Sequence, residues 1–214
     1  GEFSCDKCTY NETPHYAHYY EMVYNEQKQK YEYQKVATET FKNNLILPEL
    51  RSPLPTDRVF VGWVGGAPDA EDDGILIETF YYLYTSGQYI NIQTEATDSY
   101  FKARYVNKTL DLATVQSDQK IYDVMTVTGT LNTASYPVKI TIANGATVTL
   151  SGVNISGVNN ADYQWAGITC EGHATIILAD GTTNTVKGFY ENYPGVYVPS
   201  SYTLTIKGET AGTG

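Results

Sequence analysis

Two cysteines and two histidines near the start of the chain have side chains that can bind a transition metal. Cys5, Cys8, His15 and His18 follow the spacing C-x2-C-x6-H-x2-H. Two thiolates on a tight turn and two imidazoles can complete a tetrahedron around zinc, so this spacing predicts a small, closed, structural zinc site. A Cys5–Cys8 disulfide, which is favoured outside the cell, and a frayed terminus are the alternatives that the sequence leaves open.

Two aromatic-rich stretches form a second group of residues with recognisable chemistry. They are 159–167 (NNADYQWAG) and 188–195 (GFYENYPG). Flat aromatic rings beside amides and carboxylates suit a sugar, which presents C–H groups on its faces and hydroxyls at its edge. The sequence therefore predicts an exposed ligand-binding patch, and the alternative is that the rings pack over the edge of the fold. The candidate residues are Tyr163, Trp165, Phe189, Tyr190, Tyr193, Asp162 and Glu191.

The elements that must position these rings repeat along the chain. The stretches ITIANGATVTLSG, ITCEGHATIILADG and VYVPSSYTLTIKG begin at Ile140, Ile168 and Val196, which are 28 residues apart. Apolar residues alternate with polar ones within each stretch, and Gly, Asn and Asp supply turns. A strand-rich repeat of this length predicts a parallel β-helix, with a β-sandwich as the alternative. The ladder expected inside the coils consists of Val148, Ile176 and Leu204.

The aromatic stretches interrupt consecutive coils just before matched strands. Because one precedes Ile168 and the other precedes Val196, we expect both loops to emerge on the same side, one coil apart. Cys170 takes an apolar position in the repeat and should be a buried small hydrophobe rather than a nucleophile. No row of stacked acids and bases runs through the repeat, so we do not expect an enzyme.

The repeat resembles the β-helical segments of large surface proteins from gut-dwelling and other Gram-positive bacteria. The likeness is carried by ITCEGHATIILADGTTNTVKG and GVYVPSSYTLTIKG and covers roughly residues 121–214. It implies a right-handed β-helix of the carbohydrate-binding or adhesin type. Solenoids of this kind also occur in lyases and inert stalks, so the resemblance speaks more to fold than to activity.

Residues 55–105, in the middle part of the chain (31–108), approach the pattern P…F-x-G-W…Y-x-A-x-W/Y. With this pattern the part resembles an internalin B-type repeat, which is a small β-grasp module. The usual Asn-Gly-Gly lead-in is missing, and the segment APDAEDDGILIETFYYLYTSGQY is longer than the family pattern. The resemblance implies a spacer or adhesive unit, and it favours a core position for the tryptophan over a sugar platform. The matching residues are Pro55, Phe60, Gly62, Trp63, Phe101, Ala103 and Tyr105.

A tyrosine-rich segment precedes this module. Tyr16, Tyr20 and Tyr24 are four residues apart and would form a stripe on a helix. Tyr31 and Tyr33, with the β-rich surroundings, favour a strand instead, and the sequence leaves both interpretations open.

The overall charge limits the classes of partner. The chain of 214 residues has a formal net charge of −10, and none of its segments is basic, so we expect neither nucleic acid nor anionic membrane as a partner. No apolar run approaches the ~18 residues of a membrane span, so we do not expect membrane insertion. Hydrophobic residues make up 42% of the chain, enough for a folded core.

The sequence thus predicts an all-β protein in three parts: 1–30, with the tag-like remnant GEFS and the Cys/His segment; 31–108, a β-grasp-like module; and 109–214, a short parallel β-helix fragment. We expect a piece of an extracellular or cell-surface adhesin-like protein that binds glycans or a host surface protein without catalysis. A structural spacer is the alternative, and a β-helical polysaccharide lyase or hydrolase is a third. An unpaired strand at Thr203–Ile206 predicts self-association through the end of the β-helix.

Overall fold

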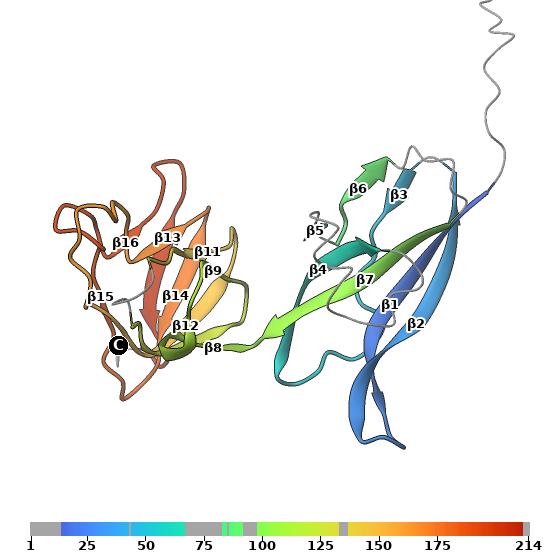
Figure 1. Cartoon of the computed structure of the whole chain (residues 1–214), viewed down its shortest axis with the longest axis horizontal. Coiled ribbons are helices and arrows are strands. Elements are labelled where there is room, and N and C mark those ends of the chain that lie inside the picture. The colour runs from blue at the N-terminus through green and yellow to red at the C-terminus, as the bar shows by residue number, and fades with distance from the viewer. Residues whose placement is uncertain are drawn as a thin grey trace, which may run out of the picture. The chain divides into compact units, whose positions relative to one another are not determined.

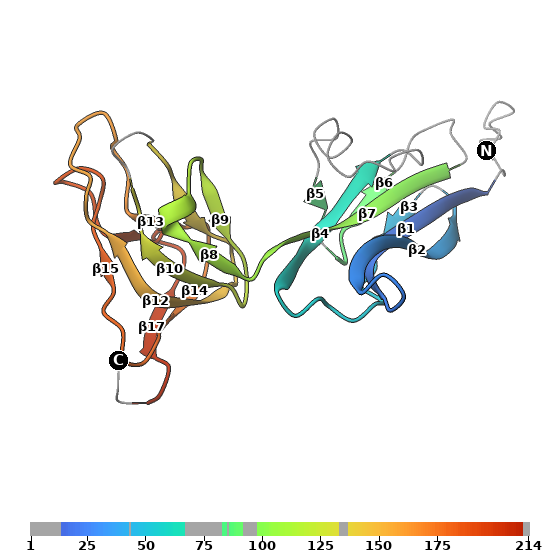
Figure 2. The same cartoon turned by 60° about the horizontal axis from the view of Figure 1, so that its bottom comes forward.

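The computed structural model describes residues 14–42, 44–66, 83–84, 86–91, 98–132 and 137–211 (Figures 1 and 2). Their elements are strands apart from one short 3-10 turn, η1 (Leu112–Thr114), which confirms the all-β prediction. The chain divides into two compact units, which are described separately. The N-terminal unit comprises Gly1–Thr56 and Phe60–Tyr105, and the C-terminal unit comprises Asp57–Val59 and Val106–Gly214.

The N-terminal unit is built on a five-stranded mixed sheet in the order β2-β1-β7-β4-β5. Strands β1 and β2 form an antiparallel hairpin, whereas β1 and β7 run parallel at the centre of the sheet. The first and last long strands of the unit therefore form a parallel pair, and β2 flanks this pair as the hairpin partner of β1. The strands are β1 (His15–Asn25), β2 (Lys30–Phe41), β4 (Arg58–Gly66), β5 (Leu83–Tyr84) and β7 (Asp98–Asn107).

Strand β1 joins the tyrosine-rich segment to the sheet. Its side chains alternate between the two faces, with Ala17 and Tyr19 buried and Tyr16 exposed, so this segment is a strand and not a helix. Because β1 pairs with both β2 and β7, the sheet contains residues that the sequence analysis placed in a separate part ending at residue 30. The strand pairing partners lie up to 82 positions away, as in Tyr16 opposite Asp98, which a local reading cannot detect.

An extended segment covers the inner face of this sheet. Strand β3 (Asn44–Ile46) pairs with β6 (Tyr89–Asn91), and the following residues include Pro48, Pro53 and Pro55, which disfavour a helix here. The segment contributes Leu45 and Leu47 to the core. The chain between β2 and β4 therefore packs on the sheet with extended backbone and not with a helix.

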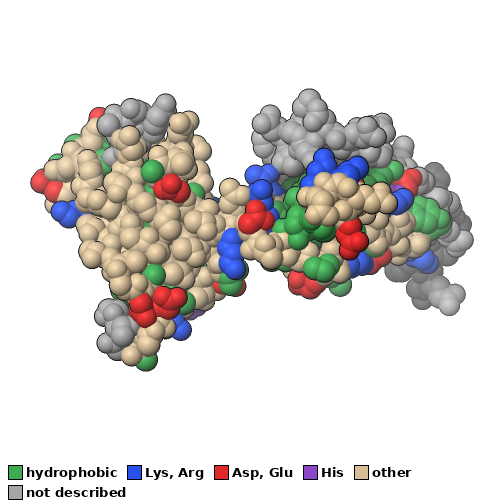
Figure 3. Space-filling model, turned by 90° about the horizontal axis from the view of Figure 1, so that it is seen from below, with side chains coloured by type: hydrophobic (Ala, Val, Ile, Leu, Met, Phe, Trp, Pro, Cys, Tyr) green, Lys and Arg blue, Asp and Glu red, His purple; other side chains and the backbone are tan. Residues whose placement is uncertain are grey.

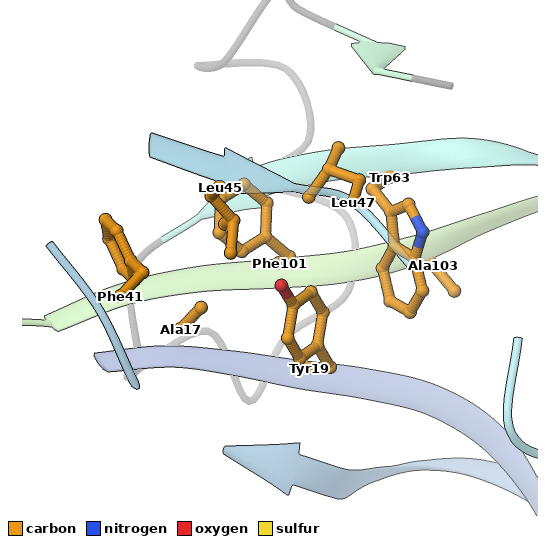
Figure 4. Packing of buried hydrophobic residues seen from close by; sticks show 8 residues of the cluster. All are labelled: Ala17, Tyr19, Phe41, Leu45, Leu47, Trp63, Phe101 and Ala103. Carbon is orange, nitrogen blue, oxygen red and sulfur yellow. The ribbon is translucent and has the colours of Figure 1, made fainter. Parts of the chain in front are cut away.

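Aromatic rings from distant strands form the core of the N-terminal unit, as Figure 4 shows. Tyr19 of β1 packs edge-on against Trp63 of β4, with ring centroids 5.2 Å apart, and stacks on Phe101 of β7 at 5.7 Å. The Trp63 indole N–H donates a 2.8 Å hydrogen bond to the carbonyl of Pro48. Trp63 is fully buried, which confirms the core position expected for it.

The C-terminal unit winds between two parallel sheets. The first sheet has the order β17-β14-β12-β10-β8, and the second has the order β16-β13-β11-β9. Apart from β15, successive strands of the chain alternate between the sheets, so each turn of the chain stacks on the previous one, as predicted for a β-solenoid. The first sheet contains β8 (Thr109–Asp111), β10 (Thr126–Thr130), β12 (Thr147–Ile155), β14 (Ala174–Leu178) and β17 (Leu204–Gly208), with β15 (Thr185–Val186) paired to the end of β12. The second contains β9 (Gln119–Ile121), β11 (Ile140–Ile142), β13 (Ile168–Cys170) and β16 (Val196–Tyr197).

The register of the last coil differs from the predicted one. Val148 pairs with Ile176 as expected, but Ile176 pairs with Ile206, and Leu204 pairs with Ala174 instead. The prediction of Leu204 in this ladder was therefore wrong by two residues. Val196 still pairs with Ile168, 28 residues earlier, so the two additional residues lie in the turn between β16 and β17. A shift of two keeps every side chain on its face, which is why the alternating pattern could not reveal it.

Apolar residues of the coils fill the space between the two sheets. Ile142, Ile168, Val148 and Ile176 are almost completely buried, and Cys170 is fully buried, as expected for a small hydrophobe. Burial also raises the pKa of the Cys170 thiol, which keeps it protonated and unreactive. Within the described part of the chain, no helix is long and apolar enough to cross a membrane.

Candidate functional site

The two aromatic loops lie against each other on one side of the solenoid. The first connects β12 to β13, and the second connects β15 to β16. The Asn160 N–H donates to the carbonyl of Phe189 at 3.0 Å, and the Phe189 N–H donates to the carbonyl of Trp165 at 3.0 Å. A third bond, 2.9 Å long, runs from the Ile168 N–H to the carbonyl of Gly195. These bonds confirm that the loops emerge together, and they hold the loops in one arrangement.

Trp165 is the fixed centre of this aromatic cluster. Its indole N–H donates a 3.1 Å hydrogen bond to the carbonyl of Val138, and its ring stacks on Tyr163 with centroids 5.4 Å apart. The Phe189 ring lies 5.7 Å away at a tilt of 37°. The Lys139 ammonium lies 5.2 Å from the Trp165 ring centroid, within the range of a cation–π interaction. The tryptophan is consequently held in place on several sides while remaining partly accessible.

Phe189 does not belong to the exposed surface that the sequence predicted. Its side chain is 0% exposed and forms a buried floor beside the Trp165 ring, whose centroid lies 5.7 Å away. The inward position of Phe189 has a physical cause. Backbone hydrogen bonds to Asn160 and Trp165 fix residue 189 between the loops, so its apolar ring turns inward. Gly188 permits this path, because a Cβ atom there would collide with the backbone of Tyr193.

The remaining candidate residues lie in the same two loops as Phe189 and Trp165. Tyr163, Tyr190 and Tyr193 are half-buried, and Asp162 and Glu191 are exposed. The Tyr193 hydroxyl donates a 3.4 Å hydrogen bond to the side-chain oxygen of Gln164, which ties the second loop to the first. We call the set of Tyr163, Trp165, Tyr190, Tyr193, Asp162 and Glu191 over Phe189 the aromatic patch.

Two neighbours of the aromatic patch were not found by sequence reasoning. Val138 and Lys139 precede β11, more than twenty residues before Trp165, yet one accepts its indole hydrogen bond and the other places a cation near its ring. They are adjacent because successive coils stack, as the pairing of β11 with β13 shows. An alignment of the coils could have indicated the neighbourhood, but not these contacts.

The two histidines of the predicted zinc site point away from each other. They are three residues apart in β1, and side chains at such positions lie on opposite faces of a strand. His15 is buried and lies 5.5 Å from the Phe41 ring. His18 lies on the other face. Strand β1 therefore does not direct both imidazoles to one ion, and Cys5 and Cys8 lie outside the described residues.

His18 instead connects three strands of the N-terminal sheet. Its Nε2 lies 2.7 Å from the Asp98 carboxylate of β7, and its Nδ1 lies 2.9 Å from the Thr38 hydroxyl of β2. The ring also stacks on Tyr100, with centroids 4.8 Å apart. Across the ranges that the structure describes, no group of three or more His, Cys, Asp and Glu side chains is arranged to hold a metal ion.

A buried carboxylate stabilises the N-terminal unit and was also missed. Glu21 is 0% exposed, and its two oxygens accept hydrogen bonds from the backbone N–H groups of Arg51 and Ser52, the shortest of which is 2.6 Å. Burial raises the pKa of nearby Tyr105 to about 12, although the Met22 N–H donates to its oxygen, and the Glu21 charge adds to the increase. The even alternation of β1 was the one signal that placed Glu21 on the inner face.

Comparison with family models, curated proteins and solved structures gives no match for this chain. The function of the aromatic patch must therefore be inferred from its own geometry. That geometry consists of a buried floor, a tryptophan held by a neighbouring coil, and two exposed carboxylates of the same loops, Asp162 and Glu191, which we call the rim carboxylates.

Proposed function

We propose that the C-terminal unit binds carbohydrate through the aromatic patch, without catalysis. The observation that carries this proposal is the stacked pair of Tyr163 and Trp165, which rests on the buried Phe189. A half-buried aromatic surface of this kind can receive the C–H face of a sugar ring. Asp162 and Glu191 at the rim can accept hydrogen bonds from the sugar hydroxyls.

The fixed positions of the rings favour binding. Trp165 is held by its hydrogen bond to Val138 and by its neighbours, and the loops are joined by backbone hydrogen bonds. A ligand that meets a preorganised surface pays less conformational entropy than one that must order two free loops. The mixture of one cation, Lys139, with the two rim carboxylates suits a neutral sugar better than a strongly charged one.

The setting proposed for this module is an extracellular or cell-surface adhesin-like protein. The resemblance of the repeat to bacterial surface proteins supports this proposal, as does a solenoid whose loops present side chains on one side. A host glycan is the partner class that the patch suits. A spacer that projects another part of a surface protein is the function that remains if the patch binds nothing.

The test is a glycan array followed by titration of the best neutral glycan. Because the chain has two tryptophans, replacing Trp63 by Phe leaves Trp165 as the reporter inside the patch. We expect the fluorescence of Trp165 to change on binding and Tyr163→Ala to weaken binding about tenfold, since it removes the stacked ring. Incubation with the same glycan and analysis for released products distinguishes binding from cleavage.

The matched control is Tyr197→Ala. Tyr197 lies in the same unit and is 49% exposed, but it belongs to β16 and not to the patch. Equal loss of affinity in both variants, or an array on which no glycan binds, would reject the proposal and leave the spacer function.

A further inference from the structure

Among the residues that the structure describes, six tyrosines lie on the outer face of the N-terminal sheet. In β1, the alternation that buries Ala17 and Tyr19 turns Tyr16, Tyr20 and Tyr24 to the opposite face. Strands β2 and β7 add further rings there, because Tyr31 pairs with Tyr24 and Tyr100 pairs with His18. The tyrosine face consists of Tyr16, Tyr20, Tyr24, Tyr31, Tyr33 and Tyr100.

Several rings of this face are fixed by contacts with one another or with neighbouring groups. Tyr24 and Tyr31 pack edge to face with centroids 5.2 Å apart. The Tyr33 hydroxyl donates a 2.8 Å hydrogen bond to the carbonyl of Ala103, and the Lys102 ammonium lies 3.9 Å from the Tyr33 ring centroid. Tyr16 is nevertheless 38% exposed and Tyr24 44% exposed. The face thus combines fixed rings with accessible ones, and Figure 3 shows hydrophobic and tyrosine side chains (green) more prominent on this unit than on the C-terminal unit.

The charge of the tyrosine face is opposite to that of the chain. Lys35 pairs with Tyr20 across β1 and β2, and Lys102 and Arg104 follow Tyr100 at alternate positions of β7. The one carboxylate on this face of the three strands is Asp98, which is bound to His18. Three cations and one anion give this face a formal charge of +2, whereas the chain has −10. Among the residues described, no acidic side chain pairs with Lys35 or Arg104.

We propose that the tyrosine face binds an acidic polysaccharide. Sugar rings would lie on the accessible faces of Tyr16 and Tyr24, and the phenolic hydroxyls would bond to sugar hydroxyls at the ring edge. The carboxylates of the polymer would pair with Lys35 and Arg104, which are exposed at either side of the rings. This proposal does not rest on the aromatic patch, which lies in the other unit and suits neutral sugars.

Hydrogen-bonding capacity favours a polysaccharide over single-stranded nucleic acid. Both polymers combine rings with anions, but a protein that binds nucleic acid without sequence preference does so through a positively charged groove and stacking of flat bases. Lys35 and Arg104 supply two unpaired cations on a chain of charge −10, which falls short of such a groove. A polysaccharide offers, beside its carboxylates, several hydroxyls on each sugar that the tyrosine hydroxyls can bond, and is the better match.

The test measures binding of the 214-residue chain to polygalacturonate by affinity electrophoresis and by titration calorimetry. Dextran serves as the neutral polymer and oligo(dT) as the nucleic acid. We expect polygalacturonate to bind, dextran and oligo(dT) to bind at least tenfold more weakly, and added salt to reduce the affinity for polygalacturonate because the ion pairs are exposed.

Substitutions at four residues locate the site. Tyr16→Ala and Tyr24→Ala remove exposed rings, and each should lower affinity roughly fivefold. Lys35→Gln and Arg104→Gln should lower it by a similar factor and reduce its salt dependence. Tyr24→Phe keeps the ring and should retain more affinity than Tyr24→Ala. All four side chains are exposed, so the variants should keep the circular dichroism spectrum of the parent.

Three outcomes would overturn the proposal: no binding of polygalacturonate, full affinity in the Tyr24→Ala and Arg104→Gln variants, or tighter binding of oligo(dT) through the same residues. Tyr163→Ala distinguishes the two proposals, because it should weaken neutral glycan binding and leave polygalacturonate binding unchanged. Failure at one face therefore does not count against the other.

Discussion

The two units build their cores in different ways. In the N-terminal unit, large rings from β1, β4 and β7 meet at one place, where Tyr19 packs against both Trp63 and Phe101. In the C-terminal unit, aliphatic residues stack in ladders, so that Val148 has the same surroundings as Ile176 one coil later. The first core is built from ring contacts that each occur once, whereas the second repeats the same kind of contact from coil to coil.

The difference also determines how burial changes along each unit. A coil of the solenoid is covered by its neighbours, so Ile176 of β14 is 1% exposed while Ile206 of β17, in the same ladder, is 54% exposed. The N-terminal sheet instead buries one face, and the outer face remains available to carry the tyrosines. Stability should therefore be concentrated in a few residues of the first unit and graded along the second.

The largest expected effect tests the concentration of stability in the N-terminal core. We expect Trp63→Ala to destabilise this unit by about 3–5 kcal/mol, because it removes a fully buried ring and the hydrogen bond to Pro48. Urea unfolding followed by far-ultraviolet circular dichroism measures the loss. In this variant Trp165 is the one remaining tryptophan, so its fluorescence reports the C-terminal unit alone.

Trp63→Phe is the control, since it keeps an aromatic ring in the core and should cost less. An unchanged Trp165 transition in Trp63→Ala would show that the two cores contribute separately. A parallel loss in both transitions would mean that the contrast between the units does not extend to their unfolding.

The next largest effect tests whether stability follows the gradient of burial along the solenoid. Ile176→Ala should destabilise the C-terminal unit by about 2–4 kcal/mol, because it opens a cavity between coils. Ile206→Ala, the same change at the paired position of the last coil, should cost less than about 1 kcal/mol. The measurement is urea unfolding followed by Trp165 fluorescence in the Trp63→Phe background. Equal costs at the two positions would contradict the graded burial.

The smallest effect is a loss of stability at alkaline pH that is specific to the N-terminal unit. The pKa of Tyr105 is raised by burial to about 12 in the folded state, whereas an exposed tyrosine titrates near 10. Between these values the unfolded chain releases its proton more readily, so stability should fall as pH rises. Burial, together with the Glu39 carboxylate, raises the pKa of Tyr19 in the same direction.

We expect a decrease of about 1 kcal/mol between pH 9 and pH 11, of which Tyr105→Phe should remove a measurable part. Urea midpoints measured at each pH for the parent and the variant test this expectation. The Trp165 transition should show a smaller pH dependence, and identical pH profiles for Tyr105→Phe and the parent would contradict the assignment to Tyr105.

The repeat could be recognised in the sequence because each coil has the same alternation of apolar and polar residues. The pairing of Ile168 with Val196 was predicted correctly. The two-residue shift at Leu204 could not be predicted. Alternation indicates on which face of the sheet a side chain lies, but not with which residue of the next strand it pairs. In the N-terminal unit, β1 was placed outside the sheet since nothing near it in sequence indicates that β7 is its neighbour.

In the aromatic patch, too, some features could be predicted from the sequence and others could not. The rings of Tyr163 and Trp165 and the shared side of the two loops could be predicted from the repeat. The inward turn of Phe189 and the contacts of Val138 and Lys139 could not, because they depend on hydrogen bonds between coils.

The sequence by itself determined the all-β class, the stacking of the coils and the alternation of faces, because these follow from local periodicity and turn residues. The tertiary structure alone decided that His15 and His18 separate, that β1 lies beside β7, and that the tyrosines share one solvent-facing surface. The physical reason is that strand pairing joins residues far apart in the chain. No short-range pattern records which strand will supply the hydrogen bonds of the next.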